Sequence, residues 1–141
     1  MSIAFPKPNE AVLARRDEIS TGLARLVAPE ALVVSEDELR SFETDALTAY
    51  RKMPLAVVLP STTAEVSAVL RFCHEHGVKV VPRGAGTSLC GGAIPQEDAI
   101  ILGVAKMSRI LETDFENRTA RVQAGVTNLA ITRRLPNLEP R

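Results

Sequence analysis

The stretch Val80-Val-Pro-Arg-Gly-Ala-Gly-Thr-Ser-Leu-Cys-Gly-Gly92 places four glycines directly after an apolar run. Glycine accepts positive φ and has no Cβ, so a ligand can approach the backbone closely and successive N–H groups can converge on an anion. Arg83 adds a fixed positive charge that serves either the anion or the protein itself. We therefore predict a phosphate-binding loop at the end of a strand. The alternative from composition alone is a mobile glycine loop or a hairpin connection.

Two common phosphate loops are excluded by their spacing. A Walker loop requires G-x-x-x-x-G-K-[ST], but Gly86 and Gly91 are followed by Gly92 where the lysine must stand. A Rossmann G-x-G-x-x-G pattern begins with Gly84 and Gly86 but has Leu89 at the third glycine. NAD is therefore not the predicted cofactor.

The segments before the loop predict a βαβ unit. The uninterrupted apolar run 55–59 is typical of a strand buried on both faces. Thr62 and Glu65 form a capping box for a helix that ends at Gly77, and residues 78–81 follow as a strand. Two such strands should be parallel with a right-handed crossover. The glycine loop would then leave the carboxyl end of a parallel strand, where α/β sheets usually bind ligands.

Shorter signals predict the remaining elements. Asn9 should cap a helix that runs to about Val27, and Thr127 should cap a final helix through about Leu135. On the helix before Gly77, the predicted buried stripe is Val66, Val69, Leu70 and Cys73. We also expect a short element at 32–34, an acidic helical turn at 35–42, strands at 99–102, 109–113 and 119–122, and a turn at 114–117.

Composition limits the domain count and the classes of partner. The chain of 141 residues suffices for one domain with a core. Its 17 acidic and 17 basic residues balance, so charge gives no case for nucleic acid or an anionic membrane. The longest apolar run, near 99–105, is too short for a membrane span, and no signal peptide is apparent.

The two cysteines, Cys73 and Cys90, have neither metal nor redox spacing. Free thiols fit a reducing compartment, so we expect a cytoplasmic location. Cys73 begins the run Cys-His-Glu-His, whose residue types suit zinc, but His74 and His76 would point to different sides of a helix. No metal site is predicted.

The run from Val81 to Pro95 closely resembles the FAD pyrophosphate loop of the vanillyl-alcohol oxidase/p-cresol methylhydroxylase flavoprotein family. The most similar branch is the FAD-linked subunit of glycolate oxidase, beside D-lactate and other 2-hydroxy-acid dehydrogenases. Similarity extends to residues 42–50, 54–60 and 120–131 and so covers most of the chain. Asp45 and Tyr50, in the first of these segments, are expected to anchor the connection before the first strand through hydrogen bonds.

The resemblance implies an α+β FAD-binding lobe with a βαβ unit, a small mixed sheet and flanking helices. Residues 1–50 would form an N-terminal helical segment and connection, and residues 51–141 the first lobe of an FAD-binding domain. A second lobe and a substrate domain would lie beyond the sequence. The implied cofactor-binding residues are Pro82, Arg83, Gly84, Ala85, Gly86, Thr87, Ser88 and Leu89.

The function implied by the resemblance is oxidation of a 2-hydroxy acid, of the glycolate or D-lactate class, by hydride transfer to FAD. Relatives with a covalent flavin carry histidine where Thr87 stands, so the FAD is expected to be non-covalent. The implied partners are FAD, the substrate and other oxidase subunits. No catalytic residue can be assigned, and the chain alone is expected to be inactive. The alternative is a truncated non-catalytic lobe that serves only as a folding or interaction module.

Overall fold

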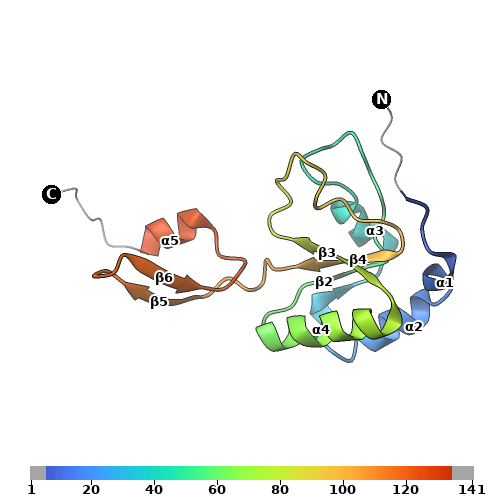
Figure 1. The fold of residues 1–141 in the computed structure, drawn as a ribbon, viewed down its shortest axis with the longest axis horizontal. Helices are drawn as coiled ribbons and strands as arrows, with labels where there is room; N and C mark the ends of the chain where they lie inside the picture. Colours follow the sequence, from blue (N-terminus) through green and yellow to red (C-terminus); the bar gives the residue numbers. More distant parts are fainter. Residues whose placement is uncertain (1–5, 135–141) are drawn as a thin grey trace.

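The computed structural model describes residues 6–134, in which two β-sheets and their helices are arranged side by side (Figure 1). The larger sheet has four strands in the order β1 (Leu32–Val33), β2 (Ala56–Val58), β4 (Ala99–Gly103), β3 (Lys79–Arg83). The smaller sheet pairs β5 (Ile110–Asp114) with β6 (Thr119–Val122). The expected α+β class, with a small mixed sheet and flanking helices, is confirmed.

Three strands of the larger sheet run parallel, and β1 is antiparallel to β2. The predicted parallel βαβ unit is confirmed as β2, α4 (Thr63–His76) and β3, although β4 lies between the two strands. Arg83 pairs with Gly103 at the carboxyl ends of β3 and β4, and the N–H of Val104 donates to the carbonyl of Arg83 at 3.0 Å. The loops that leave these two strands therefore start next to each other.

Helix α4 begins and ends as its sequence predicts. The Thr62 hydroxyl accepts from the Glu65 N–H, the Glu65 carboxylate accepts from the Thr62 N–H, and Gly77 closes the helix at φ +67°. Val69 and Cys73 are buried, but the prediction for Leu70 is wrong because its side chain is 43% exposed. The apolar stripe that meets the sheet is narrower than predicted, and Leu70 lies on its flank.

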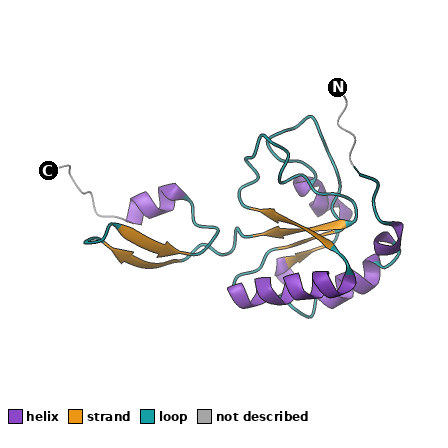
Figure 2. Ribbon diagram, in the orientation of Figure 1, coloured by secondary structure: helices purple, strands orange, loops and turns teal. Residues whose placement is uncertain are grey.

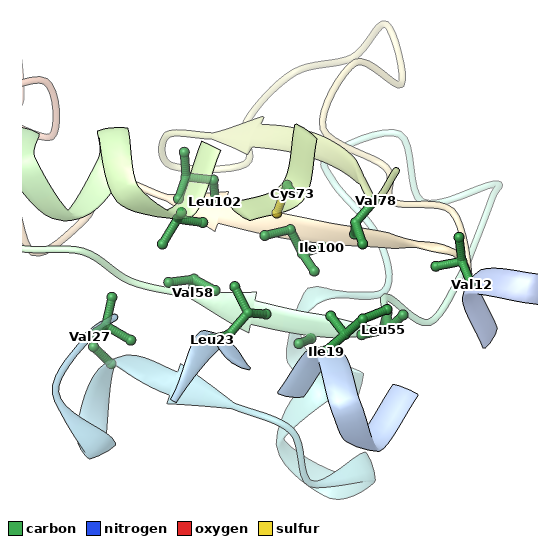
Figure 3. Close-up of a cluster of buried hydrophobic side chains, with 13 residues drawn as sticks. Val12, Ile19, Leu23, Val27, Leu55, Val58, Cys73, Val78, Ile100 and Leu102 are labelled. Carbon is green, nitrogen blue, oxygen red and sulfur yellow. The ribbon is translucent and has the colours of Figure 1, made fainter. Parts of the chain in front are cut away.

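The main core lies between the larger sheet and the helices α2 (Arg16–Leu23) and α4, which cover the same face (Figure 2). Figure 3 shows Ile19 and Leu23 of α2 pointing toward the strands, with Cys73 entering from α4. A second cluster on the opposite face contains Leu39, Val57 and Ile101. Successive residues of β2 thus belong to different clusters, which confirms a strand buried on both faces. The main cluster is formed by Val12, Ile19, Leu23, Val27, Ala31, Leu55, Ala56, Val58, Val69, Cys73, Val78, Ile100 and Leu102.

The prediction of one helix from Asn9 to Val27 is wrong, because the chain forms α1 (Glu10–Leu13) and α2 instead. Asn9 does cap α1, since its side chain accepts from the N–H of Ala11. The helix is interrupted near Arg15, whose guanidinium donates to the carbonyls of Ala11 and His76. The predicted acidic turn is present as α3 (Glu36–Leu39) and the 3₁₀ turn η2 (Arg40–Phe42), after another 3₁₀ turn, η1 (Pro29–Ala31).

The smaller sheet carries helix α5 (Asn128–Arg134) beside it (Figure 1). The predicted strands and the turn between them are confirmed, with Asn117 donating to the Asp114 carboxylate at the turn. Thr127 caps α5 by accepting from the N–H of Ala130, and the predicted end at Leu135 lies outside the described residues. Within residues 6–134, no helix combines the length and apolar character needed to cross a membrane.

Candidate functional site

A cleft of about 520 Å³ lies where loops from the two sheets meet. One wall is the start of the glycine loop after β3, the second is the connection after β4, and the third is the connection from β6 into α5. The lining consists mostly of small residues: Gly84, Ala85, Val104, Ala105, Ser108, Ala124, Gly125, Val126, Thr127 and Ala130.

Gly125 allows the connection after β4 and the β6–α5 connection to approach each other closely. Its N–H donates to the carbonyl of Met107 at 2.9 Å. A Cβ built on Gly125 would fall on the Val104 carbonyl oxygen and lie 3.0 Å from the carbonyl oxygen of Met107. Glycine is therefore required here by backbone packing, and this contact holds the β6–α5 connection beside the end of β4.

The glycine loop carries free hydrogen-bond donors, and its first two residues, Gly84 and Ala85, line the cleft. Within the described part of the chain, no hydrogen bond uses the amide N–H groups of Gly84 through Ser88. A Cβ on Gly84 would meet nothing within 4 Å, so this side of the loop is open to an approaching group. Donors without acceptors beside an open cleft are what a phosphate group requires. The residues present therefore fit a pyrophosphate.

The structure brings two of the predicted cofactor-binding residues, Gly84 and Ala85, to the lining of the cleft. Pro82 and Arg83 are the last residues of β3, an edge strand, where a proline costs no internal ladder bond. The other predicted residues follow in the loop: Gly86 at φ +70°, Thr87 and Leu89 exposed, and Ser88 accepting from the N–H of Cys90. The role of each in binding stays a prediction.

Sequence reasoning did not assign the second and third walls to the site. The connection after β4 consists of ordinary loop residues, and only the fold places it beside Gly84. The segment 120–131 did carry a signal, because its Gly125 comes directly before the cap of α5. The sequence of this segment predicts the start of a helix and carries part of the family resemblance, but neither places Gly125 beside the glycine loop.

Arg83 extends toward residues of the N-terminal connection. Its Nη1 donates to the carbonyl of Phe42 at 3.1 Å, and its guanidinium carbon lies 5.7 Å from the centre of the Phe42 ring. Burial lowers the pKa of Arg83, and the nearby carboxylate of Asp45 opposes that effect. Asp45 itself is only 5% exposed and accepts from the N–H groups of Leu47 and Ala93. Its expected anchoring role is confirmed.

Comparison with known proteins shows the family of this chain. Residues 54–138 match the FAD binding domain family. The chain is 41% identical over 134 residues to the glycolate oxidase subunit GlcD of Escherichia coli strain K12, covering 94% of the chain and 27% of that relative. It is 47% identical over 92 residues to a D-lactate dehydrogenase of Archaeoglobus fulgidus, covering 64% of the chain and 20% of the relative. The chain therefore belongs to the FAD binding domain family.

The particular relatives confirm the resemblance found in the glycine loop. The crystal structure of p-cresol methylhydroxylase with substrate bound superposes with a TM-score of 0.76 at 23% sequence identity, covering 89% of this chain and 25% of that one. This likeness shows the same fold. The chain spans about a quarter of the length of the relatives it matches.

Proposed function

We propose that this chain binds the pyrophosphate of FAD at the cleft, with the N–H groups of Gly84 to Ser88 donating to phosphate oxygens. The observation that carries the proposal is a run of amide donors without acceptors whose first two residues, Gly84 and Ala85, line a cleft, in a chain of an FAD-binding family. Thr87 is exposed in the same loop and offers a hydroxyl to the phosphate. The wall formed by residues 124–127 would limit access of water to the bound group.

In the whole protein we infer oxidation of a 2-hydroxy acid of the glycolate or D-lactate class. The flavin, when bound, supplies the hydride acceptor for the α-carbon hydrogen. The proton of the substrate hydroxyl goes to a base that is not assigned to any residue of this chain. The task of this chain is to hold and orient the cofactor, and the relative named as an oxidase subunit suggests that further subunits are partners. The free thiols of Cys73 and Cys90 favour a cytoplasmic location.

Gly84 and Gly92 provide a matched test of the binding mode. A Cβ at either position would meet nothing within 4 Å, but only Gly84 lines the cleft. We expect Gly84→Val to weaken FAD binding more than tenfold without changing the melting temperature of the apoprotein. Gly92→Val should leave FAD affinity unchanged. Flavin fluorescence titration of the full-length protein measures both.

Equal FAD affinity of the two variants would refute pyrophosphate binding at this cleft. The substrate class is tested separately, by turnover of glycolate and D-lactate with an artificial electron acceptor. A protein that binds FAD but turns over neither acid would support the non-catalytic alternative. Flavin-dependent turnover by the 141-residue chain alone would show that the missing base lies within it.

A further inference from the structure

The segment 42–47 contacts the glycine loop near its start and near its end. The N–H of Ala46 donates to the carbonyl of Gly86 at 3.0 Å. The Asp45 carboxylate accepts from the N–H of Ala93, where the loop ends, at 3.4 Å. The Leu47 side chain lies 3.5 Å from the position that a Cβ on Gly91 would occupy. The loop is thus held from the side by a separate part of the chain.

Arg83 fills the space beneath Gly86. A Cβ on Gly86 would lie 2.5 Å from Nη2 of Arg83 and 2.9 Å from its guanidinium carbon. The same guanidinium donates to the carbonyl of Phe42. Arg83 is also absent from the residues that line the cleft, within the part of the chain that the structure describes. Its guanidinium is therefore directed at the protein's own backbone, beside Gly86 and the carbonyl of Phe42.

Arg83 and Asp45 hold the loop through separate contacts to backbone: Arg83 donates to the carbonyl of Phe42, and Asp45 accepts from the N–H groups of Leu47 and Ala93. Asp45 is 5% exposed, and Arg83 is partly buried with the Asp45 charge close enough to stabilise it. Removal of either side chain therefore leaves partly or fully buried backbone groups of the same support without a hydrogen-bond partner, so loss of the second adds little once the support is broken.

We propose that Arg83 and Asp45 are positioning residues: they fix the loop so that its free N–H groups face the cleft, and neither contacts the cofactor. This inference rests on the proposed function, since it concerns how the same loop is prepared for a pyrophosphate. In this role Arg83 supports the loop and does not bind the phosphate itself. A side chain that binds phosphate acts mainly through its positive charge, whereas this support needs the planar guanidinium, which reaches Phe42 and Gly86 together.

Lysine substitution separates the two roles. Arg83→Lys keeps the charge, so a direct phosphate contact would survive it in large part. For a positioning residue we expect Arg83→Lys and Arg83→Gln to weaken FAD binding by similar factors, each tenfold or more. Asp45→Asn should cause a similar loss, and the double variant Arg83→Gln/Asp45→Asn should be no weaker than either single variant. Arg71→Gln, at an exposed position on α4, is the matched control and should bind FAD normally.

A second measurement needs no cofactor. The N–H groups of Ala46 and Ala93 report on the support directly. The Ala46 N–H donates to the Gly86 carbonyl in the loop, and the Ala93 N–H donates to the Asp45 carboxylate. Hydrogen exchange of the apoprotein should show both amides protected, and both should lose protection in the Arg83 and Asp45 variants. Amides in the middle of α4 should keep their protection and so show that the variants are folded.

The outcomes separate the two proposals. If Arg83→Lys binds FAD as the unchanged protein does, or if Ala46 and Ala93 stay protected in the variants, the positioning role is wrong. If the unchanged protein binds no FAD while the variants still lose protection at Ala46 and Ala93, the proposed function fails and the support stands.

Discussion

Gly125 and Val104 lie in direct backbone contact, although one precedes α5 and the other follows β4. The space for a side chain on Gly125 is occupied by the carbonyl oxygen of Val104. This contact joins the smaller sheet to the larger one at the wall of the cleft.

We expect Gly125→Ala to lower the free energy of unfolding by about 1–3 kcal/mol, because the added methyl group must displace backbone rather than a flexible side chain. Chemical denaturation measures this loss. Gly84→Ala is the control, since a Cβ there meets nothing within 4 Å. The same denaturation midpoint for both variants would contradict the contact.

The cofactor should leave the protein without breaking a covalent bond. Thr87 stands where covalent attachment would need a histidine, and threonine cannot form that bond, so acid or denaturant should release the flavin into solution. A denaturing gel viewed under ultraviolet light tests this directly. Fluorescence that migrates with the polypeptide would mean that a linkage exists outside the glycine loop.

The stability of the protein should depend on Asp98 in acid. Asp98 is 1% exposed, and its Oδ2 accepts from the N–H of Asn9 and the ammonium of Lys79, both at 2.8 Å. Burial disfavours the charged form, but the bonds from Lys79 and Asn9 outweigh it and hold the pKa of Asp98 below its usual value. A lowered pKa stabilises the fold above the unfolded pKa of about 3.9, and that stability is lost as the pH falls through the folded value.

Asp98→Asn should therefore cost about 1–3 kcal/mol at neutral pH and flatten the pH dependence of stability below about pH 4. Denaturation curves measured from about pH 2 to about pH 7, a range that includes the ordinary aspartate pKa of about 3.9, give both effects. Asp37→Asn, at an exposed position on α3, should leave the profile unchanged. An acid profile of Asp98→Asn that matches the unchanged protein would contradict the role of this carboxylate.

The two thiols should differ sharply in reactivity. Burial raises the pKa of Cys73 to about 11, whereas Cys90 is exposed in the glycine loop. Because the thiolate is the reactive form, Ellman's reagent near neutral pH should modify Cys90 quickly and Cys73 only after unfolding. Cys90→Ser should abolish the fast reaction. Rapid modification that persists in Cys90→Ser would mean that Cys73 is accessible.

The smaller sheet should be the least protected part of the chain in hydrogen exchange. Among the described residues, none in β5, β6 or α5 is buried, and Leu111, Phe115 and Leu129 are each about half exposed. Two-stranded sheets are marginal without further burial. Amides of β5 and β6 should exchange much faster than those of β4, whose residues are all buried. Equal protection of the two sheets would show that another contact stabilises the smaller one.

Local signals in the sequence predicted the parts of the fold that depend on neighbours along the chain. The capping box of Thr62 and Glu65 and the left-handed Gly77 are set by a few adjacent residues, so α4 was predictable. The break near Arg15 was not, because Arg15 bonds to the carbonyl of His76, which only the tertiary fold brings near.

The same division holds for the site: its local part was predictable, and the part that depends on tertiary contacts was not. The glycine pattern identified the loop, but the insertion of β4 between β2 and β3 is a property of long-range pairing. That insertion brings the connection after β4, and with it Gly125, to the loop. The partners of Asp45 and the direction of Arg83 likewise depend on where residues 42–47 lie in the fold.

The free N–H groups of Gly84 to Ser88 have a consequence for how this site can be damaged. Substitutions at the exposed non-glycine positions Ala85 and Thr87 leave the main-chain donors in place as long as the backbone path is kept, so most conservative changes there should be tolerated. A deletion or insertion of one residue changes the path itself and moves every donor out of register with the others. We expect the length of the loop to be a stricter requirement than the identity of its side chains at these non-glycine positions.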